Sequence, residues 1–142
     1  MGGWVTAPTA ANHPDLLGVV LVSAPDPGLV GTTQGDSLAA LMADNMESLS
    51  GVSAQSMGEE LVGGASGWRF ETAAPGLARM PMLVLTSDDG LAAHSDPLVR
   101  RGRMLGNTRL TMMHRLTDHS WSDKRIALQT AVLDWLTRRQ GR

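Results

Sequence analysis

The sequence predicts an α/β protein in which about three parallel strands are flanked by helices. Two short runs, residues 16–24 and 82–86, consist almost entirely of apolar side chains, as in strands that helices cover on both faces. A third run, residues 109–116, mixes apolar and polar side chains, which is typical of a strand at the edge of a sheet. Helical segments alternate with these runs, and this alternation favours a parallel sheet with right-handed crossover connections.

The chain begins with a predicted helix over residues 1–13, which leads into the first strand. Pro8 lies too far along this segment for a first-turn proline, so we expect it to kink or shorten the helix. Residues 12–15 then have the composition of a turn, and a stretch rich in Pro and Gly, residues 25–28, ends the first strand.

Two further helices are predicted in the second half of the chain. One spans residues 95–105, with Ser95 as its N-cap and a proline in its first turn. The other spans residues 123–139, where Ser122 can cap the start and two arginines complement the helix dipole at the end. The stripe that we expect this last helix to bury consists of Ile126, Leu133 and Leu136.

Residues 28–80 differ from the rest of the chain. They are rich in Gly, Ser and Met, and they contain short helical patterns at residues 37–46 and 54–61. A stretch of this length between two buried strands is usually an inserted functional element. We therefore predict a single domain portion, residues 1–142, with a cap-like helical insertion whose methionines line an apolar pocket.

Composition and charge exclude several classes of function. The net charge is −2, the pI is near 6.0 and the basic residues are dispersed, so we expect neither nucleic acid nor an anionic membrane as a partner. The chain has no cysteine, which excludes a disulfide scaffold and a thiol nucleophile and fits a reducing, cytoplasmic location. It also shows no signal-peptide pattern and no apolar run approaching the ~20 residues of a membrane span.

The residues that follow the predicted strands include groups suited to acid–base catalysis. In open parallel sheets, ligands bind at the carboxyl ends of the strands. Asp88 and Asp89 follow the second strand, and His119 follows the third. A carboxylate that holds one imidazole nitrogen leaves the other nitrogen free to take a hydroxyl proton. The pattern predicts the acid and the base of a nucleophile–base–acid relay.

Four segments, in this order along the chain, resemble the second half of the α/β-hydrolase family. MGGWVTAPTAANHP resembles the residues after the nucleophile serine in a Ser-Met-Gly-Gly elbow, and LLGVVLVSAPDPG resembles the strand after the elbow helix. PMLVLTSDDGLAAHSDPL resembles the family's late strand and acid loop, and LTDHSWSDKRIALQTAVLDWL its histidine loop and closing helix. The resemblance implies a partial α/β-hydrolase fold and a serine hydrolase, esterase- or peptidase-like, that acts on a small-molecule ester or amide without a cofactor.

The resemblance also implies the roles of individual residues. His119 would be the general base and Asp89 the acid, with Asp88 as the alternative because the acid loop is about one residue shorter than usual. Met1 matches the residue whose backbone N–H donates to the oxyanion. The elbow serine would lie just before Met1, so we expect a chain that was started at an internal methionine or cut after its nucleophile. Such a chain would have no turnover by itself.

Other polar residues have simpler expected roles. Asp26, after the first strand, is a further alternative for the acid, whereas Asp118 is expected to form a turn or to support the histidine. The histidines lack the spacing of dedicated metal ligands, so no metal site is predicted. Four serines lie outside any strand–turn–helix elbow, and turn or capping roles are expected for Ser23, Ser87, Ser120 and Ser122.

A second interpretation is a non-catalytic α/β module that binds a partner. The upstream strands of the family are absent from the sequence, so the strand at residues 16–24 would have an open edge. An open edge beside uncovered apolar helix faces favours self-association or the binding of another chain. A phosphate-accepting receiver domain is suggested only by the Asp88-Asp89 pair, and Lys124 is poorly placed to complete such a site.

Overall fold

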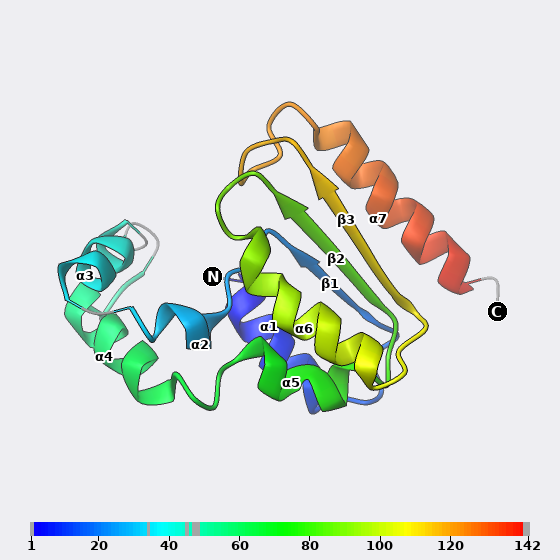
Figure 1. Ribbon diagram of the computed structural model, residues 1–142. Coiled ribbons are helices and arrows are strands. Elements are labelled where there is room, and N and C mark those ends of the chain that lie inside the picture. Colours follow the sequence, from blue (N-terminus) through cyan, green and yellow to red (C-terminus); the bar gives the residue numbers. More distant parts are fainter. Residues whose placement is uncertain (1, 34, 45, 47–48, 141–142) are drawn as a thin grey trace.

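Three parallel strands form the centre of the structure, a computed structural model that describes residues 2–33, 35–44, 46 and 49–140 (Figure 1). The strands lie side by side in the order β1 (Val19–Val22), β2 (Met82–Ser87) and β3 (Leu110–Arg115). Both neighbouring pairs are parallel, and Met82 is in register with Val19 on one side and Leu110 on the other. Every residue of β2 is buried, whereas β3 is partly exposed, as expected of an edge strand. The predicted small α/β fold with three parallel strands is confirmed.

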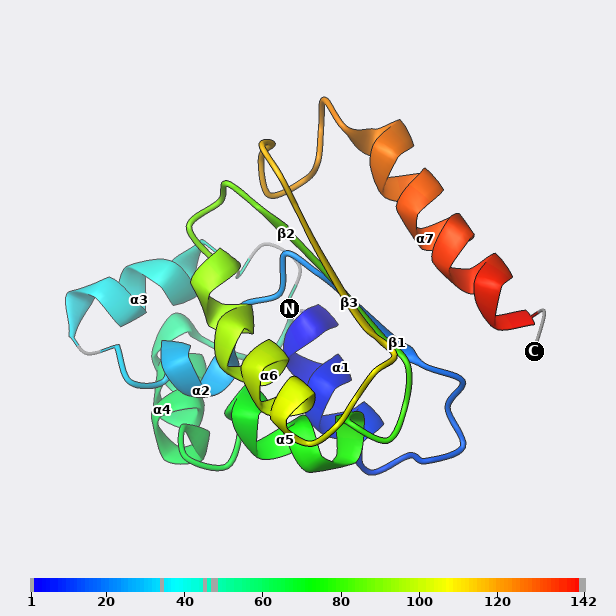
Figure 2. The same cartoon turned by 45° about the vertical axis from the view of Figure 1, so that its right-hand side comes forward.

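Helices cover both faces of this sheet (Figure 2). In chain order they are α1 (Gly2–Ala11), α2 (Pro27–Val30), α3 (Asp36–Ala43), α4 (Ala54–Gly64), α5 (Phe70–Leu77), α6 (Ala92–Met104) and α7 (Arg125–Gln140). Helices α1, α5 and α6 pack on one face, and α7 packs on the other. Within the described ranges, no helix combines the length and the hydropathy of a membrane span.

The main core lies between the sheet and the helices α1, α5 and α6. Phe70 and Leu77 of α5 and Leu98 of α6 are fully buried against the aliphatic side chains of β1 and β2. Helix α5 approaches α1 so closely that a Cβ at Gly76 would overlap the backbone of Ala11. Helix α5 therefore belongs to the layer over the sheet, although it lies in the segment 28–80 that was expected to form the insertion.

Helices α2, α3 and α4 form a separate lobe, here called the cap, which projects beyond the end of the sheet (Figure 1). Its α3 and α4 match the helical patterns predicted at residues 37–46 and 54–61. The cap has its own small core, in which Met42 is fully buried. Helix α2 lies directly on α4, since a Cβ at Gly28 or Gly31 would overlap backbone atoms of residues 61–69.

Helix α1 continues through Pro8 to Ala11, so the proline does not end it. The start predicted for α6 is wrong. Helix α6 begins at Ala92 after Leu91 at its N-cap, and Ser95 lies buried inside the helix instead of capping it. Helix α6 starts earlier because the Leu91 N–H is held by a preceding carboxylate, which fixes the turn at that point.

The buried face of α7 also differs from the prediction. Its start is Arg125, and Ile126 and Leu133 of the predicted stripe are 80% and 62% exposed. Trp135 is buried instead, and it packs on the sheet together with Leu128, Ala131 and Val132. These four positions have the i, i+3, i+4, i+7 spacing of a helix face, so α7 has two apolar stripes and the sheet covers one.

Candidate active site

Asp89 lies in the turn that follows β2. Its Oδ1 accepts a hydrogen bond from the Leu91 N–H at 2.9 Å, and its side chain is only 5% exposed. The next residue, Gly90, has a φ of +80°, a backbone conformation that favours glycine. The Asp-Asp-Gly sequence thus forms a tight turn, and the same turn holds the second carboxylate oxygen at the carboxyl end of the sheet.

His119 lies in the turn that follows β3. The carbonyl of Asp118 accepts the Trp121 N–H at 3.0 Å, and its carboxylate accepts the Ser122 N–H at 2.8 Å. These contacts with Ser122 are the main reason why the pKa of Asp118 lies below its usual value. Asp118 therefore shapes the turn that presents His119, as expected from the sequence.

The two side chains are in contact. Nδ1 of His119 lies 2.8 Å from Oδ2 of Asp89, and the imidazole is 61% exposed. An ionised carboxylate can only accept, so this contact assigns the proton of a neutral imidazole to Nδ1 and the lone pair to Nε2. Within the described residues, no hydrogen bond to Nε2 is present. The arrangement leaves Nε2 open, so the imidazole can accept a proton there, as general-base catalysis requires.

The surroundings of Asp89 favour its ionised form. Burial by itself would raise the pKa of this carboxyl group. The hydrogen bonds from Leu91, His119 and Ser87, together with the charge that His119 can bear, outweigh burial, so the pKa of Asp89 lies below 3.8. An ionised Asp89 can orient the imidazole and stabilise its protonated form.

A buried chain of hydrogen bonds supports Asp89 from behind. The Ser87 hydroxyl bonds to Asp89, Oγ of Ser23 lies 2.7 Å from Oγ of Ser87, and the indole N–H of Trp121 donates to Ser23 at 3.1 Å. Either hydroxyl can be the donor between Ser23 and Ser87, whereas the indole N–H of Trp121 can only donate. The buried chain thus connects the ends of β1 and β2 with the loop after β3, directly behind the acid.

Ser23 and Trp121 are also the two described non-glycine residues with positive φ, at 44° and 55°. A left-handed backbone is disfavoured for such residues by about 1–2 kcal/mol. The hydrogen bond between them joins the end of β1 to the loop after β3, although these strands are not neighbours in the sheet. The strained positions therefore coincide with the polar connection beneath the acid.

Asp88 has another partner. Its Oδ1 lies 2.9 Å from Nε2 of His114, whose Nδ1 lies 3.0 Å from the Thr86 hydroxyl, and its backbone N–H donates to the carbonyl of Thr117. The side chains of Asp88 and His114 are 56% and 41% exposed. Consecutive residues of the turn thus face two different histidines. It is Asp89, and not Asp88, that contacts His119.

An open pocket of about 480 Å³ lies beside His119. Its wall comes from α1, the segment after β1, the cap and the start of α6, and its residues include Trp4, Leu29, Val30, Leu91 and His94. His94 is fixed by the backbone N–H of Asp26, which donates to its Nδ1 at 3.1 Å. A mostly apolar pocket next to an imidazole whose Nε2 is open can hold a small ligand.

The structure separates the remaining candidates from this pair. Asp26 is fully buried, caps α2, accepts the N–H groups of Leu29 and Phe70, and lies 3.7 Å from Arg69, so it does not serve as the acid. Met1, the expected oxyanion donor, lies outside the described residues. No group of three or more His, Cys, Asp or Glu in the described ranges is placed to hold a metal ion.

The buried support of the acid was not predicted from the sequence. Ser23 and Ser87 were expected in turns, yet together with Trp121 they form the polar chain behind Asp89. The available signal was that each of them lies at or after the carboxyl end of a different strand, so all three meet at one edge of the sheet.

Comparisons with known proteins identify no relative. No family model, no curated protein and no solved structure matches this chain.

Proposed function

We propose that this chain forms the acid–histidine half of a serine hydrolase of the α/β-hydrolase type, with esterase- or peptidase-like activity on a small-molecule ester or amide. The observation that supports the proposal best is the 2.8 Å contact between Asp89 and His119 at the carboxyl ends of neighbouring parallel strands. The order of acid before histidine along the chain is also that of the family.

The proposed mechanism assigns one role to each group. A serine that precedes the α1 segment attacks the substrate carbonyl, and Nε2 of His119 takes its proton. The imidazolium returns this proton to the leaving group, and a water then repeats the sequence to release the acyl group. Asp89 remains ionised and stabilises the imidazolium. The N–H of Met1 would donate to the oxyanion.

The pocket beside His119 is the proposed position of the substrate. Leu29, Val30 and Leu91 give it an apolar wall, and Trp4 closes the side toward α1. The cap contributes part of this wall, so it would shape the acyl or leaving-group side. An uncharged ester or amide with a small apolar substituent fits such a lining better than a highly charged substrate does.

Labelling with a fluorophosphonate probe tests the proposal. The 142-residue chain should show neither stoichiometric labelling nor an acylation burst with an activated ester, because in the described residues no serine hydroxyl is hydrogen-bonded to His119. The chain extended with the residues that its gene encodes upstream should be labelled at a serine. His119→Asn and Asp89→Asn should slow this labelling by at least about 10³-fold.

Asp88→Asn and His114→Asn are the matched controls, because this neighbouring pair does not contact His119. They should retain most of the labelling rate. A burst from the unextended chain, an upstream reading frame without a serine, or equal losses in both pairs of variants would contradict the proposal.

The second candidate function is a non-catalytic α/β module that binds a partner through its open sheet edge. The described residues pair β1 only with β2, so its outer edge is open, and α7 exposes Ile126 and Leu133. These surfaces favour association with another chain irrespective of catalysis, and the oligomeric state measures that directly.

A further inference from the structure

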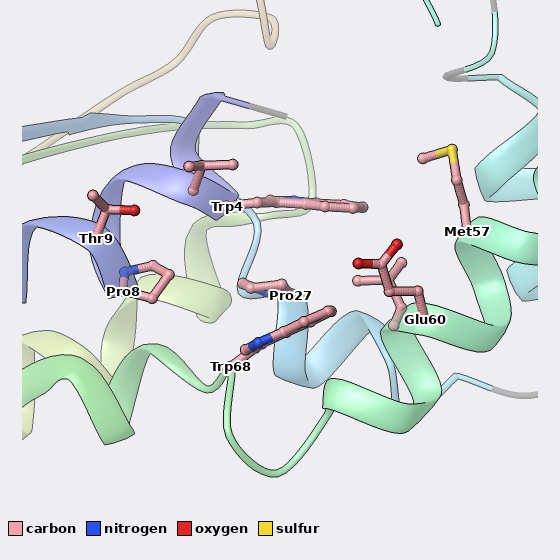
Figure 3. A pocket seen from close by; sticks show the side chains of 9 residues that line it. Trp4, Pro8, Thr9, Pro27, Met57, Glu60 and Trp68 are labelled. Carbon is pink, nitrogen blue, oxygen red and sulfur yellow. The ribbon is translucent and has the colours of Figure 1, made fainter. Parts of the chain in front are cut away.

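A second pocket, of about 320 Å³, lies between α1 and the cap helix α4 (Figure 3). Trp4 lines both this pocket and the one beside His119, but neither Asp89 nor His119 lines this one. Its volume lies at the lower end of the range for small-molecule sites. We call it the tryptophan pocket, and its lining includes Trp4, Pro27, Met57, Glu60 and Trp68.

Two indole rings form opposite parts of the wall. In Figure 3, Trp4 approaches from α1 and Trp68 from the loop before α5. In this view the Glu60 carboxylate lies below the level of the Trp4 ring and above that of the Trp68 ring. Trp68 is positioned by Gly64, because its ring lies where a Cβ of residue 64 would be and the backbone N–H of Trp68 donates to the Gly64 carbonyl at 3.0 Å. The end of α4 therefore holds the Trp68 ring in place even without a ligand.

The charge of the lining is negative. Glu60 is the one charged residue that lines the pocket, and no Lys, Arg or His lines it. Glu60 has no ion-pair partner within the part of the chain that the structure describes. Its neighbour Glu59, in contrast, accepts a hydrogen bond from Gln55 at 2.8 Å and lies outside the lining.

We propose that the tryptophan pocket binds a methylated organic cation, such as a quaternary ammonium group. The faces of indole rings attract cations, and the attraction is strongest for cations that give up their water easily. Methyl groups on the nitrogen suit the apolar surface of Pro27 and Met57, while the positive charge is complementary to Glu60. An acyl chain has no charge to complement this exposed carboxylate, and one carboxylate is too few for a metal ion.

An NMR titration with choline tests this proposal on the 142-residue chain, whether or not the chain is a hydrolase. The matched probe is 3,3-dimethyl-1-butanol, which has the shape of choline without its charge. Choline should shift the indole N–H signals of Trp4 and Trp68 saturably and bind at least about tenfold more tightly than the alcohol. Sodium chloride at equal ionic strength should cause no such shifts. Equal affinity for both probes, or no saturation by choline, would overturn the proposal.

Variants locate the site. Trp68→Leu should abolish the saturable shifts, and Glu60→Gln should weaken choline binding by about three- to tenfold while leaving the alcohol unaffected. Glu59→Gln removes the same charge one residue away and should leave both affinities unchanged. If Glu59→Gln weakens choline as much as Glu60→Gln does, the effect is one of net charge and the proposal is wrong. The two glutamine variants decide the matter even if Trp68→Leu does not fold.

Discussion

Asp89 connects the chemistry of the site to the stability of the fold. Its pKa is below 3.8 in the folded state, so between the folded and unfolded pKa values the unfolded chain binds more protons. The ionised carboxylate therefore stabilises the folded state above the unfolded pKa. This contribution is lost as the pH falls through the folded pKa.

Asp89→Asn is predicted to lower the free energy of unfolding by about 1–3 kcal/mol at pH 7, because its amide places donors against the donors of His119 and Ser87. The difference from the unmodified chain should shrink as the pH falls below 3.8. Denaturant unfolding across this range measures it. Asp88→Asn, at an exposed side chain, should stay within about 0.5 kcal/mol. A difference that grows toward low pH would refute the assignment of the lowered pKa.

The sequence indicated that Asp89 and His119 meet, but it did not indicate which side chains support the pair. Asp89 and His119 follow adjacent parallel strands, so their proximity could be predicted from chain order. The choice between Asp88 and Asp89 could not be predicted. Consecutive residues of a turn point in different directions, and a shift of the turn by one residue would exchange the two carboxylates. The hydroxyl–indole chain behind Asp89 depends on side-chain conformations at three strand ends, which no local pattern specifies.

Among the elements, the contact of α2 with α4 is sensitive to side-chain size. Gly31→Ala is predicted to destabilise the protein by about 1–3 kcal/mol, since its Cβ would overlap the Leu61 carbonyl oxygen. Gly63→Ala is the control on the same pair of helices: nothing lies within 4 Å of its Cβ, so it should be neutral or stabilising by up to about 1 kcal/mol. Thermal unfolding of both variants measures the difference. Equal effects would show that α2 and α4 do not pack as described.

Strands were easier to predict than helix faces. The runs at β1 and β2 are apolar on both sides, so any placement in a covered sheet satisfies them. Helix α7 has two apolar stripes, and the sequence alone gives no reason to prefer Trp135 with its neighbours over Ile126 and Leu133. The position of the sheet, which is a property of the tertiary structure, decides between them.

At the scale of the whole molecule, the exposed stripe of α7 and the open edge of β1 predict self-association. Ile126 and Leu133 are 80% and 62% exposed, and the described residues leave the outer edge of β1 unpaired. Light scattering after size exclusion should detect oligomers at concentrations of about 10–100 μM. Replacing Ile126 and Leu133 by Glu should shift the chain toward the monomer, whereas Val62→Glu on α4, also exposed, should not. A monomer in every case would remove the support for an interaction surface.

The small α/β class and the helical insertion followed from the alternation of patterns along the chain, which is a property of the whole sequence. The division of residues 28–80 into the cap and a helix that covers the sheet did not follow from the sequence. Helix α5 resembles the cap helices in composition, yet it packs on α1 and α6, and only its contact partners reveal this.

The left-handed backbone of Ser23 restricts what evolution can place there. Glycine would relax the backbone but would remove the hydroxyl that joins Trp121 to Ser87, and larger polar residues would not fit a position that is 4% exposed. Few residues other than serine satisfy both demands. A serine at this point, about 64 residues before a second serine that ends the next strand, is therefore a marker by which distant relatives could be recognised when overall similarity has faded.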